Sequence, residues 1–548
     1  MRRINSSTDK YYTFILAAII VFAFFIRLYN ITFPAIGYHN VKEHEMISVA
    51  KNMLKRGDFF SRYADFHYGL EVNPKKIDLF PGGHITMWQT ALCLKLFGEN
   101  NFLAAARTIN VLFFLVGIVL AFKITVLLTQ SKPLGLLTAF VLSIFPLSIF
   151  FARNLQPECP AFTGMLACVY FYLRFATVLE FRYLFFSILC AVFVFVCKLS
   201  FLICFIPLLF IIPYRRLWDK YHLLGLARNI FLTLTPLIAV AAIFWFGKEL
   251  SFRISEGRIN LLEIFSASYW HNYGVKIFLY TVKESYTVFF TMAGLLGYYM
   301  AVRNRQNVLL RRFLFGWLAA LVVYCMGLSD YINQHSYYQM PFMFIPAFSS
   351  AYALYYLGRG VNRLISHLGT ALVILFFVSA IPAIYISLWE HYCTIFSGMD
   401  AAGSFIRNHT RPEERFFLNT WCQHVGISTY ADRKCGWVKT LEEFKEKEKL
   451  FNIRFAVFYP KAYYNENTPQ DIKKYINDHY HVVYVGFIIL YRDSRSKYYN
   501  LQDEPIVLIL QKGGAYDYQA FIKDRSPVLE KEYRAFDLRV LYQAFRDD

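Results

Sequence analysis

The sequence predicts a polytopic α-helical membrane protein with about eleven transmembrane helices and a C-terminal extracytoplasmic α/β domain. Apolar runs of about 20 residues recur along the chain, long enough to cross a hydrocarbon layer of about 30 Å. Hydrophobic residues make up 57% of the 548 residues, and charged residues only 17%. The 56 Phe and 40 Tyr exceed the needs of a soluble core, and Tyr suits the membrane–water interface. From about Asp400 the charged residues become more frequent, which indicates a separate domain.

The expected transmembrane domain covers residues 1–395, with a first outer loop at 31–83. Its expected spans are, in order, 11–29, 108–128, 134–151, 160–179, two within 181–213, 230–246, 277–300, 313–328, 338–357 and 364–388. A further helix at 84–97 lies at or in the membrane.

The distribution of basic residues predicts the orientation. A net charge of +19 would suit a nucleic-acid-binding protein. However, the Lys and Arg residues cluster in alternate short loops between apolar runs, as the positive-inside rule expects. We therefore expect the cytoplasmic (cell) membrane, a cytoplasmic N-terminus, an outer C-terminal domain and no nucleic-acid partner.

Residues 396–548 are expected to form the α/β domain. Four segments rich in β-branched and aromatic residues predict strands at 415–418, 454–458, 482–491 and 506–510. Segments 441–449 and 470–478 predict helices, and the tail at 523–543 is interpreted as helical.

The stretch GYHNVKEHEMISVAKNMLKRGD, residues 37–58, follows the first span almost immediately. It places His39, Glu43, His44 and Glu45 at the start of a short amphipathic helix. Acidic residues there are favoured by the helix dipole, so capping alone explains them. A carboxylate at a membrane surface could instead act as a general base toward an acceptor. Together with an imidazole it could also hold a hard divalent cation.

Two further groups of candidates fall in outward loops. Arg153 and Glu158 could form a plain salt bridge, or supply a phosphate-binding guanidinium and a second carboxylate. Lys198 lies in an apolar region, where a cation is costly unless it is paired or bound to an anion.

A third outward group contains His335, Tyr337 and Tyr338. On one side of the membrane, these groups would suit transfer of a phosphate-activated group carried by a lipid. The cations would neutralise the leaving phosphate, and a carboxylate would activate the acceptor. The aromatic side chains would contact a prenyl chain and other membrane lipids.

Ordered motifs over about residues 10–360 carry a family resemblance. They are Arg27-Leu28-Tyr29, Lys42-Glu43-His44-Glu45, Ala50-Lys51-Asn52-Met53-Leu54, Leu96-Phe97-Gly98 with Arg107, Arg153 with Pro157-Glu158, and His335-x-Tyr337-Tyr338-x-x-Pro341. In these motifs the chain resembles the GT-C superfamily of integral-membrane glycosyltransferases. The resemblance is to polyprenyl-phosphate-sugar-dependent enzymes, the class of protein O-mannosyltransferases and aminoarabinose transferases.

The resemblance implies a glycosyltransferase of the cell envelope. It would transfer a hexosyl or pentosyl group from a polyprenyl-phosphate donor to a glycan, lipid or protein, with inversion. The general base would be Glu43 or Glu45, because the alignment can place either at the acidic position. The implied substrate-binding residues are His39, His44, Arg153, Glu158, Lys198, His335, Tyr337 and Tyr338. Mg²⁺ or Mn²⁺ is an expected cofactor, although Lys42 replaces an Asp found in many members.

Two other functions remain open. A transporter or lipid flippase would also have many spans and intramembrane polar groups. However, transporters often show paired halves with broken Gly/Pro helices, and no such halves stand out. The third hypothesis is an inactive membrane scaffold with a partner-binding outer domain. It stays open because Lys42 stands where many family members have Asp, and a shared fold does not fix function.

Overall fold

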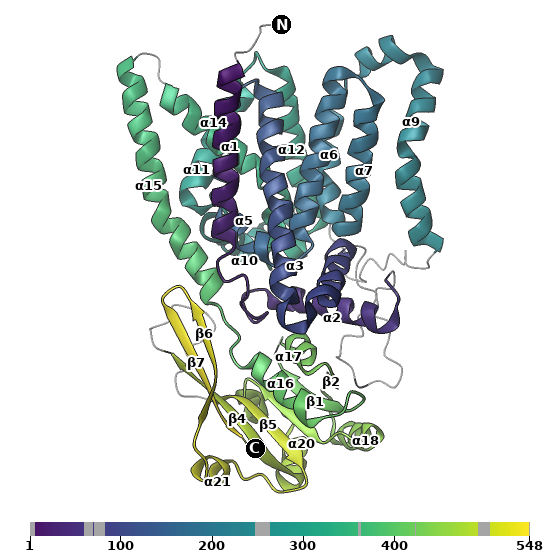
Figure 1. The fold of residues 1–548 in the computed structure, drawn as a ribbon, viewed down its shortest axis with the longest axis vertical. Helices are drawn as coiled ribbons and strands as arrows, with labels where there is room; N and C mark the ends of the chain where they lie inside the picture. The colour runs from purple at the N-terminus through teal and green to yellow at the C-terminus, as the bar shows by residue number, and fades with distance from the viewer. Residues whose placement is uncertain are drawn as a thin grey trace. The chain divides into compact units, whose positions relative to one another are not determined.

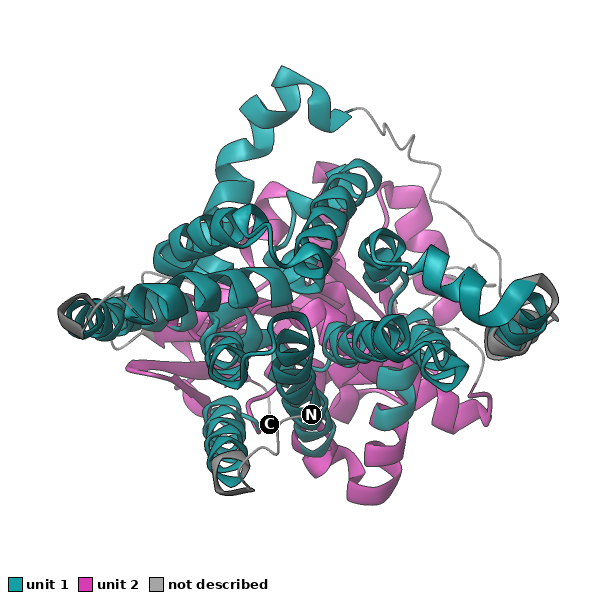
Figure 2. Ribbon diagram, turned by 90° about the horizontal axis from the view of Figure 1, so that it is seen from above, with its two compact units in different colours: residues 1–31, 80–89, 105–388 teal, residues 32–79, 90–104, 389–548 magenta. Residues whose placement is uncertain are grey.

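The computed structural model describes residues 6–59, 70, 83–246, 263–359, 363–421, 423–490 and 505–546. The chain divides into two compact units (Figure 2). Unit 1 contains Met1–Ile31, Phe80–Gln89 and Ala105–Leu388, and unit 2 contains Thr32–Leu79, Thr90–Ala104 and Trp389–Asp548. The expected first outer loop at 31–83 lies partly outside the described residues. Its described part groups with the C-terminal segment in unit 2.

Unit 1 is built from helices (Figure 1). They are α1 (Ser6–Arg27), α3 (His84–Thr129), α4 (Lys132–Ile144), α5 (Pro146–Arg153), α6 (Glu158–Val178), α7 (Phe181–Cys197), α8 (Phe205–Phe210), α9 (Tyr214–Phe246), α10 (Ala267–Leu279), α11 (Thr287–Arg303), α12 (Val308–Gly327), α13 (Ser329–Ile332), α14 (Phe344–Arg359) and α15 (Arg363–Cys393), with short segments η1 (Leu199–Cys204), η2 (Glu263–Phe265), η3 (Tyr280–Ser285) and η4 (Ser336–Phe342). Within the described ranges, five helices are long and apolar enough to cross a membrane, or up to eight if each of three bent pairs is one span. The expected count of about eleven stays a prediction.

Two breaks interrupt these helices where the sequence demands them. Helix α3 joins the two segments predicted at 84–97 and 108–128, and it breaks at Gly98, where φ is 70° and ψ is 175°. A positive φ favours glycine, which lacks a Cβ. Helices α4 and α5 are bent by 65° at Pro146, because proline lacks the N–H that would continue the helix. The span expected at 134–151 is therefore a bent pair.

Helices α11 and α14 approach closely at a glycine. A Cβ added at Gly297 of α11 would lie 1.7 Å from the backbone oxygen of Ser349 in α14. Small residues allow such close backbone packing between helices in membranes.

Replacing Gly297 by Ala is expected to separate these helices and destabilise unit 1 by about 1–3 kcal/mol, as overpacking does. Thermal unfolding in detergent would measure the loss. The matched control is Gly327→Ala at the end of α12, where an added Cβ meets nothing within 4 Å. Equal unfolding temperatures of the two variants would contradict the close packing.

Unit 2 contains a seven-stranded sheet in the order β2-β1-β3-β5-β4-β7-β6. The strands are β1 (Arg415–Thr420), β2 (Lys434–Gly436), β3 (Phe455–Tyr459), β4 (Tyr480–Leu490), β5 (Pro505–Lys512), β6 (Val528–Ala535) and β7 (Leu538–Arg546). Strand β1 pairs in parallel with β2 and β3, and the other pairs are antiparallel. The four predicted strands are confirmed as β1, β3, β4 and β5.

The helices of unit 2 pack on this sheet or on one another. They are α2 (Asn40–Arg56), α16 (Met399–His409), α17 (His424–Ala431), α18 (Leu441–Phe451), α19 (Ala462–Glu466), α20 (Gln470–His479) and α21 (Tyr518–Lys523). The two helices predicted at 441–449 and 470–478 are confirmed as α18 and α20. Helix α2 packs on α17, and α17 packs on α16.

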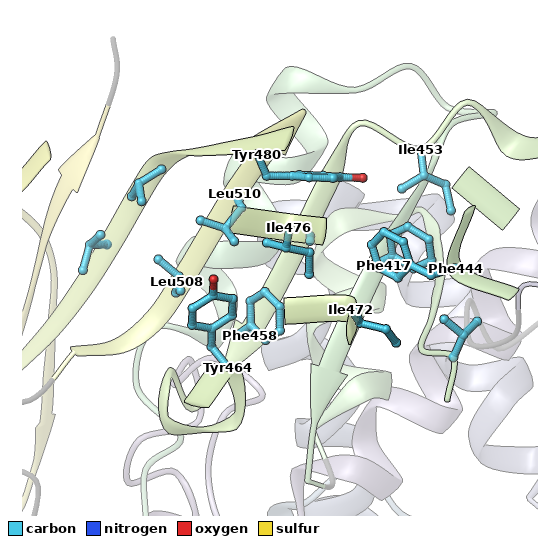
Figure 3. Close-up of a cluster of buried hydrophobic side chains, with 14 of the residues drawn as sticks. Phe417, Phe444, Ile453, Phe458, Tyr464, Ile472, Ile476, Tyr480, Leu508 and Leu510 are labelled. Atoms are coloured by element: carbon cyan, nitrogen blue, oxygen red, sulfur yellow. The ribbon is translucent and has the colours of Figure 1, made fainter. Parts of the chain in front are cut away.

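One face of the sheet carries the apolar core of unit 2 (Figure 3). Phe417 of β1 stacks on Phe444 of α18 with 3.9 Å between ring centroids. Ile472 of α20, Phe458 of β3 and Leu508 of β5 complete its centre, and all are fully buried. Burial of each such side chain contributes about 1.5–3 kcal/mol.

Helix α16 packs on the opposite face. Its Phe405 contacts Phe455 of β3, and successive residues of a strand point to opposite faces, so Phe455 faces away from Ala456 in the core. The sheet therefore lies between two helical layers.

The predicted helix at 523–543 is wrong. This segment forms most of the β6–β7 hairpin, whose two-residue turn places Phe536 at a φ of 51°. Buried Tyr533 and Ala535 alternate with exposed neighbours, and a period of two is that of a strand. The many charged residues on the exposed face hid this alternation in the sequence.

Candidate functional site

Four helix ends in unit 1 bring polar side chains together. Arg153 is the last residue of α5, Glu158 is the first of α6, and Lys198 follows α7 directly. His335 precedes η4, which contacts both α5 and α6. Residues far apart in sequence therefore gather at one end of this helical unit.

A buried ion pair lies at the centre of this group. Lys198 Nζ donates a hydrogen bond to Glu158 Oε1. The Glu158 side chain is only 2% exposed, whereas that of Lys198 is 23% exposed. Among the described residues, Glu158 Oε2 has no hydrogen-bond partner. Glu158 pairs with Lys198 rather than with Arg153. Glu158 is thus the partner that a lysine in an apolar region requires.

Two aromatic rings lie against the cation of this pair, and His335 stacks on one of them. Lys198 Nζ lies 5.0 Å from the ring centroids of both Tyr337 and Tyr338. His335 stacks on Tyr337 with 5.1 Å between centroids. The backbone oxygen of Tyr338 accepts a hydrogen bond from Tyr324 at 2.9 Å. Cation–π contacts of this kind hold an ammonium in place while leaving its N–H groups available to an anion.

Arg153 lies beside this cluster and is also buried. Its Nη1 donates to the backbone oxygen of Asn30, and its guanidinium lies 5.6 Å from the ring centroid of Phe150. The turn that follows α1 thus fixes the position of this guanidinium.

Sequence reasoning did not assign a role to Arg27, which organises the same region. Arg27 is fully buried and donates hydrogen bonds of 2.9 Å to the oxygens of Ala23 and Ser143 and to Ser148 Oγ. It ties the end of α1 to α4 and α5. The Arg-Leu-Tyr motif marked this residue, but only as a sign of family resemblance.

Asn110 was missed altogether. Its amide donates to the backbone oxygens of Asn154 at 2.5 Å and Gln156 at 3.2 Å, and it accepts from Gln89 at 2.7 Å. These bonds fix the short link between Arg153 and Glu158. A single amide in an apolar helix carries no sequence signal for this role.

The first-loop candidates lie in unit 2, on α2. Glu43 is in the first turn and is 3% exposed. Glu45 instead forms an ion pair of 2.7 Å with Lys42, and both side chains are less buried, at 16% and 43% exposure. The structure therefore distinguishes the two carboxylates that the sequence left equal.

The two histidines beside them have structural contacts of their own. His44 is buried, and its Nε2 lies 2.5 Å from the backbone oxygen of Ala35. His39 precedes α2 at a φ of 58°, an uncommon conformation for a residue with a Cβ. Its ring lies 3.9 Å from that of Tyr38, centroid to centroid.

The expected Mg²⁺ or Mn²⁺ cofactor stays a prediction. Among the residues that the structure describes, no group of three or more His, Cys, Asp and Glu side chains is placed to hold a metal ion. The His44 Nε2 atom already contacts Ala35, and Glu45 is bound to Lys42. No reaction step is therefore assigned to a bound cation.

Comparisons with known proteins bear on the fold. No protein-family model and no curated protein matches this sequence. Among solved structures, ArnT from Cupriavidus metallidurans bound to undecaprenyl phosphate is similar with a TM-score of 0.51 and 13% identity, over 91% of this chain and 97% of that chain. Apo ArnT from the same organism is similar with a TM-score of 0.52 and 13% identity, over 92% and 98%. The predicted fold class, a polytopic α-helical membrane protein with a C-terminal sheet region, is confirmed.

Proposed function

From the GT-C glycosyltransferase fold of this multi-pass membrane protein, we propose that it transfers a sugar from a polyprenyl-phosphate donor. The acceptor is a glycan, lipid or protein at the outer face of the cytoplasmic membrane. The similarity to an ArnT structure that binds undecaprenyl phosphate, over nearly the full length of both chains, is the observation that carries this proposal.

The reaction is a single displacement. The acceptor oxygen attacks the anomeric carbon of the sugar, and the bond from that carbon to the phosphate oxygen breaks. Polyprenyl phosphate leaves with the electron pair, and the base takes the acceptor's proton. One displacement inverts the anomeric centre. The transferred group is a hexosyl or pentosyl sugar.

The Lys198 cluster is assigned to the donor phosphate. An ammonium has three N–H donors and Lys198 uses one of them on Glu158, so it can donate another to a phosphate oxygen. Arg153 supplies a second cation. Such donors stabilise the negative charge that develops as the phosphate leaves. Glu158 holds Lys198 in position, and His335, Tyr337 and Tyr338 form the surrounding wall.

Glu43 is assigned as the general base. Glu43 is buried in the first turn of α2, whereas the Glu45 side chain is more exposed. His39 and His44 are assigned to acceptor binding beside it.

A requirement for Mg²⁺ or Mn²⁺ remains a prediction, which transfer activity after EDTA treatment would test. Loss of activity that Mg²⁺ or Mn²⁺ restores would support the cation. Full activity in EDTA would contradict it, and would agree with the charge-neutralising role given to Lys198 and Arg153.

The transporter or flippase hypothesis is not favoured, because the similarity in fold is to glycosyltransferase structures. Membranes that contain the protein, supplied with labelled polyprenyl-phosphate sugars, would distinguish the two. Transfer of label to an acceptor would support the enzyme. Movement of labelled lipid between leaflets without transfer would support a flippase.

A further inference from the structure

Unit 2 contains two adjoining cavities along helix α16. One has a volume of about 320 Å³ and is lined by residues of α2, α16, α17 and the segment 99–104. The other has a volume of about 540 Å³ and lies between α16 and the β6–β7 hairpin. Both are lined by Ser404 and Lys531, so they adjoin at these residues. We call the two together the α16 groove.

The acidic side chains of the groove already have partners. Glu99 forms an ion pair of 2.6 Å with Arg407, and Glu530 accepts a hydrogen bond of 2.7 Å from Tyr484. Asp400 is buried and accepts a hydrogen bond of 2.5 Å from Tyr533. Burial raises the pKa of Asp400.

Two lysines of the groove are only weakly compensated. The Lys51 side chain is 11% exposed, and its Nζ lies 3.5 Å from both Glu99 Oε1 and the backbone oxygen of Thr429. Burial lowers the pKa of Lys51 despite the nearby Glu99 and Asp432 carboxylates. Lys531 is exposed, and its charge interacts with the Asp400 carboxylate without forming an ion pair within 4 Å among the described residues. An anion placed between them would gain charge-assisted hydrogen bonds.

The rest of the lining suits a sugar chain better than a bare ion. Asn100, Asn101 and Asn408 offer amide donors and acceptors for hydroxyl groups. Phe405 and Tyr430 supply apolar surface. The combined volume exceeds what a single phosphate fills.

We propose that the α16 groove binds an acidic saccharide, as the part of the acceptor that carries carboxylate groups. This inference rests on the proposed function, since it names the acceptor class. Lys51 and Lys531 bind the carboxylates, and the amides of the lining bind the sugar hydroxyls.

The test measures binding of trigalacturonate to the full-length protein in nanodiscs, with maltotriose as the neutral probe of the same length and inorganic phosphate as a third probe. We expect trigalacturonate to bind, and Lys51→Gln and Lys531→Gln each to weaken it about ten-fold, as loss of a charge-assisted hydrogen bond does. The control is Lys449→Gln, which removes an equal charge from the exposed surface of α18 outside the groove.

Three results would overturn the inference: no binding, equal binding of maltotriose, or equal weakening by Lys449→Gln. If inorganic phosphate displaced trigalacturonate at equal concentration, the groove would be a site for free phosphate and not for a saccharide. Unfolding temperatures of the variants separate lost binding from lost folding. Binding needs no catalysis, so sugar transfer without groove binding contradicts this inference alone. Groove binding without any sugar transfer contradicts the proposed function alone.

Discussion

Replacing Glu43 by Gln is expected to lower the turnover of sugar transfer by about 10²- to 10⁴-fold, the contribution of a positioned general base. Glutamine keeps the size of the side chain but cannot take the acceptor's proton. Initial rates with a labelled polyprenyl-phosphate sugar would measure the loss, at equal amounts of folded protein.

The matched control is Glu45→Gln, two residues along the same helix. The Glu45 carboxylate is bound to Lys42 and is more exposed than Glu43, so we expect less than about a ten-fold loss, as for a surface ion pair. A larger loss of activity in Glu45→Gln than in Glu43→Gln would show that Glu45 is the general base. Full activity in both variants would show that the general base is not on α2.

Replacing Lys198 by Met is expected to abolish transfer and to destabilise the protein by about 3–5 kcal/mol, because a buried carboxylate is left without its partner. Glu158, at 2% exposure, has no solvent to replace the lost ammonium. Thermal unfolding in detergent and initial transfer rates would measure the two effects separately.

The double variant Lys198→Met with Glu158→Gln separates stability from function. It removes both charges, so the unfolding temperature should recover most of its loss. Transfer should stay lost, because the donor phosphate still lacks its ammonium. Recovery of transfer together with stability would show that the ion pair is structural only.

The strands of unit 2 could be predicted because β-branched and aromatic residues concentrate in them. Residues 455–459 and 505–512 are apolar over most of their length, as buried central strands are. The β6–β7 hairpin has only half of its residues on a buried face, and its charged face at Glu532 and Arg534 resembles that of a surface helix. The alternation of buried and exposed residues in this hairpin was therefore hard to see among its many charged residues.

The sequence predicted which residues belong to the candidate site but not which of them pair with each other. The cost of a charge in an apolar region showed that Lys198 needs a partner. The sequence suggested a salt bridge of Glu158 with Arg153, five positions away, as one possibility, and it named no partner for Lys198, 40 positions from Glu158. The packing of the helices brings Lys198 to Glu158, because α6 begins beside the end of α7. The polar link held by Asn110 depends on the same packing and has no local signal.

The grouping of residues 32–59 with the C-terminal segment also required the structure. Helix α2 packs on α17 through the Ser48 and Thr429 hydroxyls, which lie 2.8 Å apart and 381 positions apart in sequence. Neither residue stands out in a single sequence, because Ser and Thr are common on helices.

The central claim is that the chain transfers sugar from a polyprenyl-phosphate donor, and a transfer assay with the purified protein tests it most directly. The protein in nanodiscs would receive labelled undecaprenyl-phosphate hexoses and pentoses together with a cell-envelope acceptor extract. We predict label in the acceptor fraction, release of undecaprenyl phosphate in equal amount, and loss of both in Glu43→Gln. No transfer from any donor by folded wild-type protein would contradict the account.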